Sequence, residues 1–309
     1  MNKLADHSIT QHETERLLRL ATYASVSVAT SLILMKLIAW GLSHSISLMA
    51  TLIDSVLDAI ASTINLIAVR HALTPADKEH RFGHGKAEAL AGLCQSLFIT
   101  GSAGFLLLEV AHHIFNPIEI KHASISILIM VLSIVATLLL VLFQNYVVRK
   151  TQSTAIRADA LHYKSDLLAN GGVILALWLS LQGIHQADVV IGGLIALYIL
   201  YSAWEIVRTA FDQLMDRELP DAVREEIFEI IMQHPHAQGA HDLRTRHAGT
   251  SAFIQFHLEL EDNLSLIEAH GISDEVEARL MQAFPGSEII IHMDPNSVVG
   301  HETTDEFHE

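Results

Sequence analysis

The sequence predicts an α-helical membrane protein with six transmembrane helices, followed by a small α+β domain outside the membrane. Half of the 309 residues are hydrophobic and the mean hydropathy is +0.35, which is more apolar than an ordinary soluble domain. Apolar windows of about 20 residues, each long enough to span a bilayer, recur along the first two thirds of the chain. Residues 210–309 hold 5 basic and 21 acidic groups and so carry the whole net charge of −16. The chain therefore divides into two domains of different character.

The transmembrane domain is expected over residues 21–210, after a polar N-terminal segment, 1–20. This segment shows no small-residue cleavage site, so a cleaved signal peptide is not expected. Basic residues gather in the loops on one side, whereas the opposite loops contain only Lys121. The positive-inside rule then predicts that both termini are cytoplasmic. The six windows lie at 21–42, 47–71, 88–112, 123–148, 154–182 and 187–208, and the second, fifth and sixth are interrupted by polar residues.

The cytoplasmic domain is expected over residues 211–298, with a disordered tail at 299–309. Ser265 and Glu268 form a capping-box pattern that marks the start of its second helix. The order α-β-β-α-β predicts a small open sheet with helices on one face, as in ferredoxin-like folds. We expect helices at 220–235 and 265–285 and strands at 240–247, 252–261 and 287–295, the first two strands joined by a turn at 248–250.

Two apolar windows each carry a pair of metal-ligand residues one helical turn apart. Asp54 and Asp58 form the first pair, and His162 and Asp166 the second. Residues spaced i,i+4 share one helix face, so two adjacent helices could close a tetrahedral site of three carboxylates and one imidazole. Charged groups in hydrocarbon usually mark an ion pathway, although hydrogen bonds or a buried lysine could also satisfy these carboxylates. Such a ligand set suits Zn²⁺, and also Cd²⁺ or Fe²⁺.

A loop between the second and third windows contains a further candidate metal site. Asp77, His80 and His84 follow the pattern Asp-x2-His-x3-His, which could wrap around a divalent ion. Gly83 and Gly85 would allow the tight backbone that this requires. The alternative is an ordinary polar connection.

The cytoplasmic domain contains a third set of candidate ligands. Along the second strand, apolar residues take one face and leave His257 on the other, and His292 and Asp294 share a face of the third strand. Single histidines of this kind are often hydrogen-bonded surface residues, but their number favours a metal site. The candidate ligands are His241, His257, His270, His292 and Asp294, whereas His234, His236 and His247 are expected to be solvated.

Composition excludes several other classes of protein. An acidic domain disfavours nucleic acid as a partner, because phosphates need a basic surface. The single cysteine, Cys94, excludes an internal disulfide framework and a cysteine-rich zinc site. A membrane metalloenzyme is disfavoured because the sequence has neither HExxH nor GxSxG. A membrane-anchored metal sensor is disfavoured because an anchor would not need ligands within its spans.

Five motifs together resemble the cation diffusion facilitator family: DSVLD, PADKEHRFGHGK, LHYKSD, HDLRTR and IIIHMDP. The resemblance implies efflux of Zn²⁺, Fe²⁺ or Cd²⁺ across the inner membrane by proton antiport, in a homodimer embedded in the lipid bilayer. It implies a transport site at Asp54, Asp58, His162 and Asp166, a loop site at Asp77, His80 and His84, and a binuclear cytoplasmic site drawn from the five ligands above. It also implies an ion pair between Lys86 and Asp216 and a hydrophobic gate at Leu161. Met293 departs from the family pattern, where glutamine is common between the histidine and the aspartate.

Overall fold

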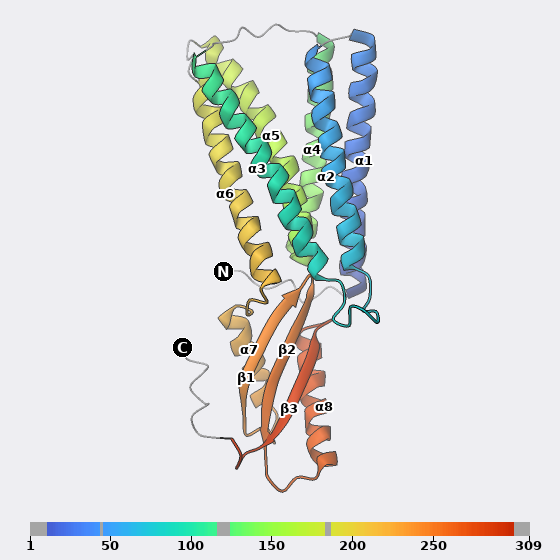
Figure 1. Cartoon of the computed structure of the whole chain (residues 1–309), viewed down its shortest axis with the longest axis vertical. Helices are drawn as coiled ribbons and strands as arrows, with labels where there is room; N and C mark the ends of the chain where they lie inside the picture. The colour runs from blue at the N-terminus through green and yellow to red at the C-terminus, as the bar shows by residue number, and fades with distance from the viewer. Residues whose placement is uncertain (1–10, 44–45, 116–123, 183–186, 300–309) are drawn as a thin grey trace. The chain divides into compact units, whose positions relative to one another are not determined.

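The computed structural model describes residues 11–43, 46–115, 124–182 and 187–299 (Figure 1). These residues form two compact units, one over Glu13–Phe211 and the other built on the chain from Asp212 onward. The first unit is helical and the second combines a sheet with two helices, so the predicted fold class is confirmed. Each unit has its own packed core.

Six long helices make up the described part of the first unit, and each corresponds to one of the predicted apolar windows. The helices extend beyond the windows at several ends, because hydropathy detects only the part suited to the membrane. α1, for example, begins at Gln11 rather than at residue 21. The bounds are α1 Gln11–Ser43, α2 Ile46–Ala72, α3 Lys86–Phe115, α4 Ser124–Thr151, α5 Thr154–Leu181 and α6 Ala187–Leu214.

Length and composition alone identify four stretches of the described residues that could cross a membrane: 12–41, 86–108, 131–151 and 189–214. They belong to α1, α3, α4 and α6. The other two long helices, α2 and α5, carry the acidic residues proposed as metal ligands. Large apolar side chains such as Leu97, Phe105 and Leu194 are exposed around the unit, as expected of a surface that faces lipid.

Helix α5 has a central place in the first unit. It packs against α3 and α4 and also touches α2 (Figure 1). At Gly172 an added Cβ would lie 2.4 Å from Ile195 Cδ1, at the tip of a side chain of α6. Small residues at such contacts let membrane helices pack closely. The residues proposed as ligands on α5 are therefore held inside the bundle.

The second unit has the predicted order α-β-β-α-β and one three-stranded sheet. Strand β2 lies in the middle, antiparallel to β1 and parallel to β3, and the helices pack together on one face (Figure 1). Ile254, Phe256 and Leu258 face these helices and are buried, as the alternation in the sequence predicts. The bounds are α7 Asp221–Met232, β1 Gly239–Ala248, β2 Ser251–Leu260, α8 Leu266–Ala283 and β3 Glu288–Pro295.

Local signals in this unit were mostly correct, with two exceptions among the histidines. Ser265 caps α8 and forms the full capping box with Glu268. His236 is exposed as expected, but the prediction of a solvated side chain is wrong for His234, which is 3% exposed and lies 3.0 Å from Glu275 of α8. His247 is also partly buried, and burial lowers the pKa of its imidazole. The error at His234 arises because packing against a distant helix cannot be read from a nearby turn.

Candidate metal centres

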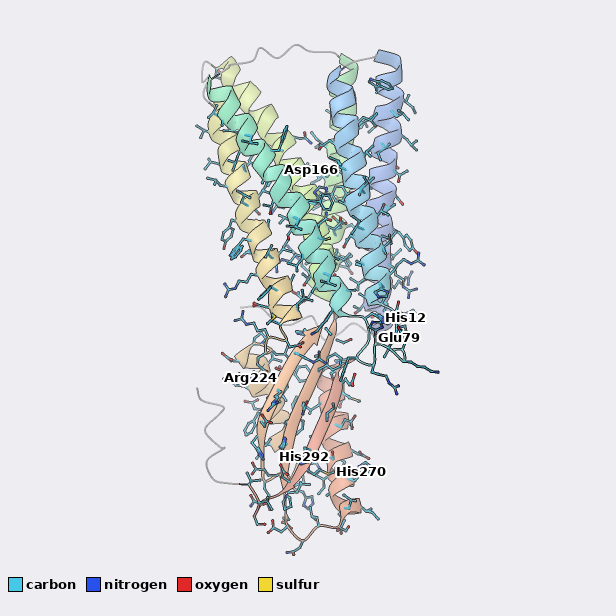
Figure 2. The ribbon with its side chains drawn as sticks, in the orientation of Figure 1. His12, Glu79, Asp166, Arg224, His270 and His292 are labelled. Carbon is cyan, nitrogen blue, oxygen red and sulfur yellow. The ribbon has the colours of Figure 1, made fainter. Side chains whose placement is uncertain are left out.

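The intramembrane centre joins residues from α2 and α5. His162 Nε2 lies 3.1 Å from Asp58 Oδ1. One ligand atom each from Asp58, His162 and Asp166 can be chosen so that all lie within 4.8 Å of one another. Figure 2 shows Asp166 among the helices of the first unit. Three of the four predicted ligands therefore converge on one point.

The fourth predicted ligand, Asp54, lies one turn before Asp58 on α2. It is more exposed than the other three and lies outside their close group, although it interacts electrostatically with Asp58 and His162. Closure of a four-ligand site thus requires Asp54 to approach the others.

Lys36 of α1 is a cation beside this anionic centre. Its ammonium donates a hydrogen bond to Ser55 Oγ at 2.6 Å, and Ser55 adjoins Asp54 in the sequence. Lys36 also interacts electrostatically with Asp54, Asp58 and Asp166. A charged residue in an apolar helix is visible in the sequence, but its partners on another helix are not.

The loop centre lies between α2 and α3. Asp77 is 3.4 Å from His80 Nδ1 and 3.5 Å from His84 Nε2, and these three residues form a second ligand group. The backbone N–H groups of His80 and Glu79 donate to Asp77 and hold the pKa of its carboxyl below the ordinary value. Gly83 has φ +74°, a left-handed conformation that favours glycine.

The cytoplasmic centre lies on the open face of the sheet, where three histidines stand side by side. His241 pairs with His257 across β1 and β2, and His257 pairs with His292 across β2 and β3. Asp294 Oδ2 lies 2.7 Å from His257 Nδ1 and 3.6 Å from His241 Nε2, and its Oδ1 lies 3.3 Å from His292 Nε2. One carboxylate thus contacts three imidazoles.

Glu259 belongs to this centre and was missed from the sequence. Its carboxylate lies 2.8 Å from His241 Nδ1 and is nearly buried. A carboxylate behind a ligand histidine fixes the orientation of the ring. Gly239 makes room for it, since a Cβ there would lie 2.3 Å from Glu259 Oε2. Glu259 is two residues after His257 on one strand face, the same spacing that singled out His292 and Asp294, so the signal was present.

The remaining predicted residues are His270, Leu161, Lys86 and Asp216. His270 is exposed on α8, 3.5 Å from Asp274, and outside the ligand group of the sheet (Figure 2). Leu161 is buried in an apolar cluster with residues of α3 and α6. Lys86 and Asp216 belong to different units, so their pairing stays a prediction.

Comparison with known proteins defines the class to which this fold and these centres belong. The family model described as cation efflux transmembrane domain matches residues 22–215, and the one described as cation efflux protein, cytoplasmic domain, matches residues 219–296. The chain therefore belongs to the cation efflux family. It is a membrane transporter for divalent metal efflux and not an enzyme.

Individual relatives are similar along almost the whole chain. The cation-efflux pump FieF of Salmonella choleraesuis is 50% identical over 287 residues, which cover 93% of this chain and 96% of that protein. The cation-efflux pump FieF of Klebsiella pneumoniae is 50% identical over 284 residues, covering 92% and 95%. Among solved structures, the zinc form of the zinc transporter CzrB is 36% identical, covering 28% of this chain and 99% of its own, with a TM-score of 0.27.

Proposed function

We propose that this chain exports Zn²⁺ from the cytoplasm in exchange for protons, with Fe²⁺ or Cd²⁺ as alternative cargo. The observation that carries the proposal is the convergence of Asp58, His162 and Asp166 within the unit that matches the cation efflux transmembrane domain. Intramembrane ionisable groups of this kind mark ion pathways. In the proposed cycle Asp54 completes a tetrahedral site, and alternating access exposes that site to each side of the membrane in turn.

Proton coupling is supported by the chemistry of the ligands. Metal binding requires a neutral imidazole and ionised carboxylates, so protons and metal compete for the same atoms. Three carboxylates and the Lys36 ammonium carry two net negative charges, which one divalent ion neutralises. A neutral loaded site lowers the cost of holding charge in a medium of low dielectric constant. This charge balance favours exchange of a divalent cation for protons over transport of the metal alone.

The other two centres are proposed to have regulatory and accessory roles. Zn²⁺ at the cytoplasmic centre would draw two copies of the chain together as a homodimer, with His270 joining the site and Met293 contributing its main chain. Asp77, His80 and His84 would hold a metal beside the cytoplasmic membrane surface. Both termini would be cytoplasmic and the chain would lie in the inner membrane. Lys86 and Asp216 would link the two units, and Leu161 would close a gate.

The test is metal flux into proteoliposomes that contain the purified full-length protein, with an imposed pH gradient. Asp58→Ala removes one ligand from the convergent group and should abolish Zn²⁺ flux while the protein still inserts. Glu205→Ala is the matched control, because Glu205 is a half-exposed carboxylate on α6 that lies 4.0 Å from Arg157. Its flux should equal that of the unmodified protein. Zn²⁺ flux at the parental rate in Asp58→Ala would refute the site, and flux insensitive to the pH gradient would refute antiport.

A further inference from the structure

A buried polar cluster in the first unit lies outside the three metal centres. Asp159 Oδ2 accepts hydrogen bonds from Ser25 Oγ at 2.5 Å and from Gln144 Nε2 at 2.7 Å, and Gln144 Nε2 also lies 2.8 Å from Ser25 Oγ. Tyr163 Oη lies 2.7 Å from Ser62 Oγ and 3.4 Å from the carbonyl oxygen of Ser25. These five residues, called the Asp159 network below, join α1, α2, α4 and α5.

The Asp159 network is costly for the stability of the fold. All five side chains are at most 1% exposed. Asp159 Oδ1 and Gln144 Oε1 have no hydrogen-bond partner among the described residues, although Asn65 lies beside the carboxylate. Apolar side chains of similar volume often pack as stably as a partly satisfied polar network. Helix packing alone therefore gives no reason for a carboxyl group at this position.

The network continues the two helix faces that carry the metal ligands. On α2, Ser62 follows Asp58 by four residues. On α5, Asp159 precedes His162 by three residues and Asp166 by seven, spacings that keep one face. With a rise of about 1.5 Å per residue, Asp159 lies roughly 4.5 Å along α5 from His162, toward the start of the helix. That end of the unit also carries the 73–85 loop.

We infer that Asp159 is a positioning residue for transport, and that its network holds α5 against α1, α2 and α4 on the loop side of the intramembrane centre. While its hydrogen bonds are formed, the network blocks access to the metal ligands from that end of the unit. For the centre to open toward the loop side, α5 must separate from Ser25 and Gln144. This inference rests on the proposed alternating access at Asp58, His162 and Asp166.

The hydrogen bonds make this closure a discrete state. A buried carboxylate that moves away from both donors loses the hydrogen bonds that offset the cost of its burial. Arrangements in which the helices are only partly separated are therefore unfavourable. Either the network is intact, or the helices separate far enough for water to replace its donors. Bistable packing of this kind, rather than continuous deformation, underlies switching in proteins. The network would thus affect the rate of alternation and not the affinity for metal.

The experiment compares variants of the full-length protein in proteoliposomes, with initial Zn²⁺ flux measured over a range of Zn²⁺ concentrations. Asp159→Leu removes the carboxylate, and Ser25→Ala removes one donor with minimal change of volume. Thr22→Val is the matched control for Ser25→Ala. Thr22 is buried one turn earlier on α1, and its hydroxyl bonds only the carbonyl oxygens of Leu18 and Arg19 in its own helix.

We expect the maximal rate of Zn²⁺ flux to fall without a loss of apparent affinity for Zn²⁺. Asp159→Leu should lower the maximal rate by about tenfold or more, with KM for Zn²⁺ within about threefold of the parent and no decrease in melting temperature. Ser25→Ala should lower the rate less, Asp159→Asn should retain most of it, and Thr22→Val should match the parent.

Three results would overturn the inference. A parental rate of Zn²⁺ flux in Asp159→Leu would mean that the network serves helix packing and not transport. A raised KM with an unchanged maximal rate would mean that it acts on the ligands instead. An equal loss in Ser25→Ala and Thr22→Val would indicate general destabilisation. Asp58→Ala, measured alongside, keeps the two proposals separate, because its activity bears on the metal site whatever Asp159→Leu does.

Discussion

The charge of the intramembrane centre depends on a single ammonium group. Lys36 is anchored to Ser55 and interacts electrostatically with three carboxylates of the centre. It offsets part of their charge when metal is absent, and it repels an arriving cation. In the proposed transport site this lysine would weaken metal binding, which would help the transporter to release its cargo.

Replacing this lysine should tighten binding and slow transport. In Lys36→Met the nearby positive charge is lost while the long apolar stem is kept. We expect Zn²⁺ affinity to rise by about tenfold, equivalent to about 1.4 kcal/mol, and the maximal flux to fall. Binding by isothermal titration in detergent and flux in proteoliposomes would measure the two effects.

Lys164→Met serves as the control, since the ammonium of Lys164 donates a hydrogen bond to Tyr198 Oη on α6 at 2.5 Å. Both its affinity and its flux should remain at parental values. Unchanged Zn²⁺ affinity in Lys36→Met would show that the ammonium does not act on the metal.

At the scale of elements, two adjacent glycines on α6 differ in their surroundings. A Cβ on Gly192 would lie 2.8 Å from Val110 Cγ2 of α3, whereas a Cβ on Gly193 would meet nothing within 4 Å. Alanine is favoured over glycine inside a helix by about 1 kcal/mol. Gly193→Ala should therefore raise the melting temperature in detergent, and Gly192→Ala should lower it, because α3 and α6 must move apart. Equal shifts for both variants would mean that α3 and α6 do not pack here.

The start of α8 should become less ordered in acid. Hydrogen bonds from the Ser265 side chain and backbone N–H lower the pKa of Glu268 below its ordinary value. A carboxyl with a depressed pKa stabilises the folded state above its unfolded pKa, and this contribution is lost as pH falls through the folded pKa. The protection of the amides of residues 265–270 against hydrogen exchange, relative to the intrinsic exchange rate at each pH, should therefore decrease below about pH 4.

Two variants separate the cap from general acid unfolding. In Ser265→Ala the amides of this segment should exchange faster than in the parent even at neutral pH, because the cap is absent at every pH. Glu268→Gln should show a weaker dependence on pH in this segment, while the core strand β2 remains protected in every protein. Identical pH profiles for the parent and Glu268→Gln would contradict the role of this carboxyl.

At the scale of the whole molecule, the net negative charge belongs to one unit, which has its own core. Residues 210–309 carry the whole net charge of −16, so metal bound at the cytoplasmic centre relieves part of their mutual repulsion. A ligand present at about 100 times its Kd stabilises a fold by about 2.7 kcal/mol. For a domain of this size that corresponds to a melting shift of about 10 °C or more.

A fragment from residue 212 should show this shift with micromolar Zn²⁺, together with a change from monomer to dimer in sedimentation. His257→Ala should remove most of both effects, because His257 stands between His241 and His292 on the sheet. His236→Ala, which alters an exposed histidine beside a turn, should behave like the parent fragment. In the full-length protein His257→Ala should slow Zn²⁺ flux without abolishing it. Melting curves that do not respond to Zn²⁺ would contradict the regulatory role.

Local patterns in the sequence were sufficient for the elements and for the facing of many side chains. Six apolar windows correspond to six long helices, and the order α-β-β-α-β is the observed order. The cap at Ser265, the buried face of β2, and the shared face of His292 and Asp294 were also correct. These features follow from periods of 3.6 and 2 residues and from the preferences of helix ends, which a single stretch of chain expresses by itself.

Contacts between distant segments were decided only by the tertiary structure. Two i,i+4 pairs could be placed on helix faces, but only the packing of α2 on α5 brought Asp58 to His162 and left Asp54 outside the close group. The contact of α1 with α2 likewise set Lys36 on Ser55. The burial of His234 against Glu275 and the Asp159 network likewise join segments far apart in the chain. A repeating pattern specifies which face of an element is polar. Which polar groups meet depends on how helices and strands pack, because each hydrogen bond needs its two atoms within about 3.5 Å.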